Sequence, residues 1–146
     1  MKLTVYKLRN FAVVTTLALT SFAAHAASVK LSADLKGSKE VPAKDVAGVG
    51  TLTATLDTDT NELKYHVVYS GLTGAVTAAH FHGPAAEGVN ARPAVPVKSP
   101  YDAPIDGTAT LTADQAKDLL EGKWYFNLHT AANPGGEIRG QVSKAN

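Results

Sequence analysis

The stretch KWYFNLHTAANPGGEIRGQV, residues 123–142, decides the fold because it reads as two strands joined by a tight turn. The turn residues suit such a connection, since proline presets φ and glycine accepts positive φ. They are Asn133, Pro134, Gly135 and Gly136. If Leu128 pairs with Ile138, the large apolar side chains of both strands share one face. A slip by one residue would expose Trp124 and Phe126 to water, so the pattern specifies this register.

The opposite face of the same hairpin follows from the alternation of side chains along a strand. It carries Tyr125, Asn127 and His129, which lie across from Gln141, Arg139 and Glu137, respectively. His129 is therefore expected beside Glu137, on a face with no large apolar group.

The rest of the chain also alternates with a period of two, which is typical of half-buried strands. We predict an all-β fold: a β-sandwich of Greek-key type, immunoglobulin-like or superoxide-dismutase-like, with about seven or eight antiparallel strands and one short helix. The other expected strands are residues 29–35, 50–57, 63–71, 76–82 and 107–111.

One helix is expected within residues 111–123, because Thr112 and Gln115 have the spacing of a capping box and Gly122 suits a helix C-terminus. Residues 83–104 are rich in proline and glycine and are expected to form a long loop. Loops of this length in small domains are commonly functional.

The N-terminus reads as a secretory signal peptide, with basic residues, a short apolar run and small residues before position 27. We therefore expect a signal peptide at 1–26, one domain at 27–146, and a periplasmic or secreted location with no membrane span after cleavage. Removing the three basic residues of this segment from 14 Lys and Arg against 13 acids leaves a net charge of −2. Such a balance argues against a nucleic acid partner.

Three histidines are candidate metal ligands. His80 and His82 are two residues apart on an expected strand, so their rings project to the same side, roughly 6 to 7 Å apart along the chain. His129 could supply a third ligand from a neighbouring strand, and Glu137 could ligate directly or accept a ring N–H. The chain has no cysteine, and imidazole ligands with an optional carboxylate suit one copper or zinc ion.

A simpler interpretation stays open, in which these rings only form a polar network with tyrosine, asparagine and backbone carbonyls. His66, alone on its expected strand, is interpreted as structural. Glu137 and Arg139 are expected to form a surface ion pair of little energetic weight. The sequence shows no nucleophile beside a base, so no residue is assigned a catalytic role and a binding protein is favoured over an enzyme.

The segments AAHFHGPAAEG (78–88) and LTADQAKDLLEGKWYFNLHTAANPGGEIRGQV (111–142) resemble the CHRD domain, which is named for its occurrence in chordin and also occurs as a stand-alone exported domain in bacteria. The similarity runs from about residue 31 to 142. It places three histidines and the end of the hairpin in the most recognisable elements of the family: His80, His82, His129, Asn133, Gly135, Gly136, Glu137 and Arg139. Chordin is an extracellular antagonist of growth-factor signalling, which implies binding rather than catalysis.

A fainter similarity is to copper-zinc superoxide dismutase, whose β-sandwich also presents an H-x-H strand. The bracing cysteines of that enzyme are absent here, and only four histidines follow residue 26, too few for its second metal site. Three hypotheses follow. The chain is a metal-binding protein supported by Tyr125, Asn127, Glu137 and Arg139; or an extracytoplasmic protein-binding or structural module without metal; or a dismutase-like redox enzyme.

Overall fold

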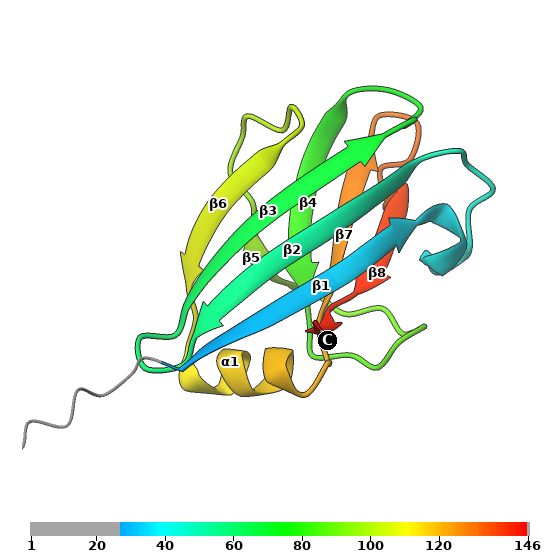
Figure 1. The fold of residues 1–146 in the computed structure, drawn as a ribbon. Coiled ribbons are helices and arrows are strands. Elements are labelled where there is room, and N and C mark those ends of the chain that lie inside the picture. Colours follow the sequence, from blue (N-terminus) through cyan, green and yellow to red (C-terminus); the bar gives the residue numbers. More distant parts are fainter. Residues whose placement is uncertain (1–26, 146) are drawn as a thin grey trace, which may run out of the picture.

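A computed structural model describes residues 27–145 of the chain, and the expected signal peptide at 1–26 lies outside this part. The described chain is all-β with one short helix, α1 (Figure 1). The strands are β1 (Ser28–Lys36), β2 (Val49–Asp57), β3 (Glu62–Ser70), β4 (Val76–His82), β5 (Pro93–Pro96), β6 (Ile105–Thr110), β7 (Tyr125–Thr130), β8 (Ile138–Gln141) and β9 (Ser143–Lys144). A 3-10 turn, Gly37–Lys39, follows β1, and α1 spans Ala113–Leu120.

The strands form an antiparallel sheet in the order β5-β4-β7-β8-β1-β2-β3-β6, and β9 pairs with β1. The sheet folds over, so that β4, β7 and β8 lie behind β1, β2 and β3 (Figure 1). Contact between the two layers is direct, because the rings of Tyr65 on β3 and Phe81 on β4 are 5.2 Å apart. The core lies between the layers, as expected for an all-β domain.

The predicted register of the last hairpin is confirmed, with Leu128 opposite Ile138 and Phe126 opposite Gly140. Trp124 and Phe126 are almost fully buried in the core. Burial of this aromatic pair is strongly favourable, so a shift of one residue would be costly.

Strand β5 corrects the expectation that residues 83–104 form a continuous loop. Its sequence, PAVP, has a proline at each end, which argues against a strand within a sheet. Strand β5 is nevertheless formed because it lies at the sheet edge and pairs with β4 alone, where a missing N–H can face away from the ladder. The two-residue strand β9 was also missed.

Helix α1 begins with the expected capping box between Thr112 and Gln115. Its C-cap residue, Glu121, is followed by Gly122 with a φ of 73°, which glycine adopts without strain. Ala116 and Leu119 are buried, and the helix lies across one end of the two layers (Figure 1). Within residues 27–145, no helix has the length and apolar character needed to span a membrane.

Candidate metal centre

The polar face of β7 is buried, although an exposed face is the usual outcome of alternation. All six residues of β7 are buried. The segment between β4 and β5, residues 83–92, folds back over this face and is called the covering segment below. Hydrogen bonds hold that segment in place: Arg139 donates to Asn90 Oδ1 at 2.9 Å and to the Val89 carbonyl at 2.8 Å. The outcome is a second, polar interior on the side of the sheet away from the apolar core.

His80, His82 and His129 meet in this polar interior. Strands β4 and β7 are neighbours, with His80 opposite Asn127 and Ala78 opposite His129. One ring nitrogen from each histidine lies within 4.8 Å of the other two, and His80 Nδ1 is 3.1 Å from His129 Nε2. The expected proximity of the three rings is therefore confirmed.

Backbone carbonyls fix the protonation of two of these rings. The Nδ1 atom of His82 is 3.0 Å from the Ala91 carbonyl, and that of His129 is 2.9 Å from the Pro134 carbonyl. A carbonyl oxygen only accepts, so each Nδ1 carries the hydrogen and donates it. In the neutral rings both Nε2 atoms then present a lone pair. Such outer hydrogen bonds orient metal-ligating histidines in known sites.

The environment also favours neutral rings at His80 and His82. Burial lowers the pKa of His80, and the nearby His129 and His82 lower it further. Burial likewise lowers the pKa of His82, although the contacts of this ring with the Ala91 carbonyl and the Asn127 amide act in the opposite direction. Metal ions bind only the unprotonated nitrogen, so a lowered pKa reduces competition from protons.

Tyr125 and Arg139 form a stack over His82. The rings of His82 and Tyr125 are 4.6 Å apart and nearly parallel, at 4°. The guanidinium carbon of Arg139 lies 3.4 Å from the centre of the Tyr125 ring, a cation–π contact. This stack fixes the plane of the His82 imidazole. Arg139 also bonds to Asn90, so the stack is joined to the covering segment.

Glu137 lies outside the histidine cluster. Its carboxylate accepts hydrogen bonds from the Thr73 N–H at 2.7 Å, the Thr73 hydroxyl at 2.6 Å and the Asn133 amide at 3.1 Å, and a further one from the Thr130 hydroxyl. Burial alone would raise the pKa of Glu137, but these hydrogen bonds outweigh it and the pKa is lowered. Among residues 27–145 no hydrogen bond joins this carboxylate to a histidine.

The expected surface ion pair between Glu137 and Arg139 is wrong. Both side chains are buried, at 0% and 2% exposure, and in the described part of the chain no ion pair joins them. The two residues share a face of β8 as alternation requires, but each finds partners in a different segment. Their partners, Thr73 and Asn90, come from loops that a strand pattern does not place.

The Asn133–Gly136 turn serves the site as well as the hairpin. Gly136 donates its N–H to the Asn133 carbonyl at 3.0 Å and has a φ of 124°, which only glycine adopts readily. The same turn supplies the Pro134 carbonyl that receives the His129 N–H.

Sequence reasoning missed Glu40, which lies at the back of the site. Its side chain is 6% exposed, and its Oε1 atom has no hydrogen-bond partner among the described residues. Burial raises the pKa of Glu40, while the charge of Arg139 and the amide of Asn127 oppose that rise. Nothing in the sequence around Glu40 signals this position, because Asn127 and Arg139, which act on it at the site, are more than eighty residues away along the chain.

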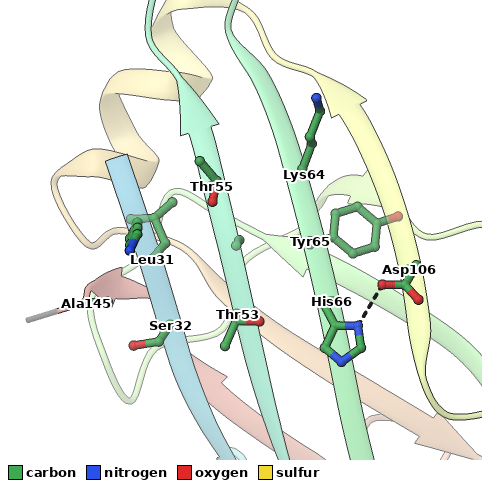
Figure 2. A pocket seen from close by; sticks show the side chains of 11 residues that line it. Leu31, Ser32, Thr53, Thr55, Lys64, Tyr65, His66, Asp106 and Ala145 are labelled. Carbon is green, nitrogen blue, oxygen red and sulfur yellow. Dashed lines mark hydrogen bonds and ion pairs between the residues drawn. The ribbon is translucent and has the colours of Figure 1, made fainter. Parts of the chain in front are cut away.

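His66 lies on the other side of the molecule, apart from the three clustered histidines. Its Nδ1 is 2.7 Å from Asp106 Oδ1, and both side chains are largely exposed. Figure 2 shows this pair at a groove of about 400 Å³, which Thr53, Thr55 and Lys64 also line. Within residues 27–145, His66 is not part of the histidine cluster, which makes it a suitable control position.

The chain matches the CHRD domain family over residues 31–142. No match was found among curated proteins or among solved structures. The matched range includes the three histidines, the covering segment and the final hairpin, and it spans most of the sequence. The chain therefore belongs to the CHRD domain family.

Proposed function

We propose that this CHRD domain is exported and binds one copper or zinc ion through His80, His82 and His129. The proposal rests on the convergence of ring nitrogens from two adjacent strands. In the His82 and His129 rings, the other nitrogen donates its hydrogen to a backbone carbonyl, which leaves Nε2 free for the ion. Ligands of this kind must approach one ion to about 2.0–2.1 Å. Two nitrogens bound to one ion are at most about 4.2 Å apart, so three nitrogens that already lie within 4.8 Å of one another need only a small adjustment.

The chemistry of the donors limits the choice of ion. Imidazole nitrogens suit copper(II) and zinc(II), and a site without thiolate or thioether does not select copper(I). The three rings are held by the β4–β7 ladder, by two backbone carbonyls and by the Tyr125–Arg139 stack. An ordered set of ligands loses little conformational entropy on binding, which favours high affinity.

Metal analysis after equilibrium dialysis tests the proposal. We expect the wild-type protein to retain one copper or zinc ion per chain, and the His80→Ala and His129→Ala variants to retain far less while keeping the circular dichroism spectrum of the folded domain. The His66→Ala variant is the matched control and should bind like wild type. If the wild-type chain retains no ion, the histidines form a polar network and the domain is a protein-binding or structural module.

Two further measurements separate the remaining parts of the proposal. N-terminal sequencing of the protein recovered from outside the cytoplasm should begin near Ala27 if the chain is exported with cleavage of residues 1–26. A superoxide dismutation assay on the copper-loaded protein should show no turnover above that of the His129→Ala variant if the site only binds the ion.

A further inference from the structure

Asn127 lies between the two imidazoles whose protonation is fixed. It is 2% exposed, and its Oδ1 atom is 3.0 Å from His82 Nε2 and 2.9 Å from His129 Nε2. On β7 it is two residues before His129, so both side chains project from the same face. The amide therefore belongs to the same cluster of polar atoms as the three histidines.

The orientation of this amide depends on Glu40. A Cβ atom built on Gly136 would lie 2.4 Å from Glu40 Oε1 and 2.8 Å from Asn127 Nδ2, so the two groups are neighbours and glycine leaves the space for them. A carboxylate accepts hydrogen bonds and an amide NH₂ group donates them. The buried Oε1 atom has no hydrogen-bond partner among the described residues, so a donor group, Nδ2, is favoured on its side and Oδ1 is turned toward the imidazoles.

This arrangement leaves acceptors facing one another. With the hydrogens of His82 and His129 committed to Ala91 and Pro134, both Nε2 atoms carry lone pairs, and so does the amide oxygen between them. The His80 ring can donate one hydrogen to His129 Nε2. No hydrogen is available for the contact between His82 Nε2 and Asn127 Oδ1, because both atoms are acceptors. Buried acceptors without a donor are costly, and a cation placed among them removes that cost.

The spacing of the four atoms also has a regular order. Going from His80 Nδ1 to His129 Nε2, to Asn127 Oδ1 and to His82 Nε2, successive distances are 3.1, 2.9 and 3.0 Å. Donors at right angles on an ion with bonds of about 2.0–2.1 Å are about 2.9 Å apart, whereas tetrahedral donors are about 3.4 Å apart. These three distances are closer to the spacing of donors at right angles, as in the tetragonal arrangement that nitrogen and oxygen donors give with copper(II).

Building on the proposed metal site, we propose that Asn127 Oδ1 is a fourth protein donor in a tetragonal copper(II) site, and that Glu40 is the positioning residue that holds the amide in this orientation. The ligand set is then three nitrogens and one neutral oxygen. Zinc(II), which prefers a tetrahedral arrangement, should bind more weakly than copper(II) to the same four atoms.

Electron paramagnetic resonance of the copper(II)-loaded protein, combined with copper affinity, tests both roles. We expect Asn127→Leu, which keeps the approximate volume of the side chain, to weaken copper binding about 10- to 100-fold and to change the parallel g and hyperfine values. Glu40→Leu should produce a similar spectral change, because the amide loses the neighbouring carboxylate that orients it. Glu40→Gln keeps an acceptor oxygen and should restore the wild-type spectrum.

The outcomes distinguish this inference from the proposed function. Copper binding by wild type that requires the histidines, with affinity and spectrum unchanged in Asn127→Leu, would overturn the oxygen donor and leave the three-histidine site intact. An unchanged spectrum in Glu40→Leu would overturn the positioning role. If Glu40→Leu does not fold, Glu40→Ala takes its place. Absence of copper binding by the wild-type protein would overturn this inference, and absence of both copper and zinc binding would overturn the proposed function as well.

Discussion

At the scale of single residues, the His82 ring is constrained from several sides. Its ring is held by the Ala91 carbonyl, by Asn127 and by the stacked Tyr125 ring. We predict that His82→Ala weakens copper binding at least tenfold, because one nitrogen donor is removed from the ion. Competition with a chromophoric copper chelator measures the affinity. The same substitution at His66 should have no effect, and equal loss in both variants would indicate binding at surface histidines.

Glu137 provides a residue-scale prediction about pH. The pKa of Glu137 is lowered in the folded chain from its ordinary value of 4.5. At a pH just below 4.5, this carboxylate is therefore protonated more often in the unfolded chain than in the folded chain. The stabilisation by Glu137 is thus present in full above that value and is lost as the pH falls through the lowered pKa. We predict that Glu137→Gln reduces the free energy of unfolding at pH 7 by about 1–3 kcal/mol and flattens its decline in acid.

Urea unfolding between pH 3 and pH 7 measures this effect. The exposed Glu87 offers the control, since Glu87→Gln should preserve both the stability and its acid profile. A Glu137→Gln variant with the wild-type profile would show that the hydrogen bonds from Thr73 and Thr130 do not depend on the charge.

At the scale of secondary-structure elements, the cap of α1 is separable from the metal site. Thr112 accepts a hydrogen bond from the Gln115 N–H at 3.2 Å, and the helix packs at the end of the layers. We predict that Thr112→Ala lowers the free energy of unfolding by about 1 kcal/mol, while Thr112→Ser keeps it near wild type. Copper affinity should be the same in both variants. A change in affinity would mean that α1 influences the β4–β7 ladder.

The elements differ in how far the sequence predicts them. The register of β7 and β8 was predictable, because Trp124 and Phe126 must face the core and alternation then fixes Asn127 and His129. The neighbours β4 and β7 were not predictable, since the order of strands in a sheet is not encoded by periodicity. Strand β5 was missed because its prolines are tolerated only at an edge, and the edge is a property of the assembled sheet.

At the scale of the whole molecule, the metal should stabilise the fold. An ion that binds the folded chain alone adds about 2.7 kcal/mol when its free concentration is 100 times the dissociation constant. We predict that copper(II) raises the midpoint of thermal unfolding of the wild-type protein and leaves that of His129→Ala nearly unchanged. Differential scanning calorimetry measures the shift, with magnesium(II) as the control ion. Equal shifts in both variants would indicate binding away from the histidines.

The site also depends on long-range contacts that no local pattern contains. The three histidines were identifiable from an H-x-H strand and from the face assigned to His129. The roles of Glu40, Ala91 and Pro134 were not identifiable. Glu40 reaches the site from the end of the 3-10 turn that follows β1, and the other two act through backbone carbonyls, which any residue type possesses. The folded chain as a whole is needed to bring these groups together.

Metal binding by His80, His82 and His129 is tested most directly by a crystal structure of the protein grown with one equivalent of copper(II). Diffraction data would be collected on both sides of the copper absorption edge. We predict one anomalous peak per chain, within about 2.0–2.2 Å of His80 Nδ1, His82 Nε2 and His129 Nε2. A peak only at His66 or at another surface group, or no peak while the three rings keep their hydrogen bonds, would contradict it.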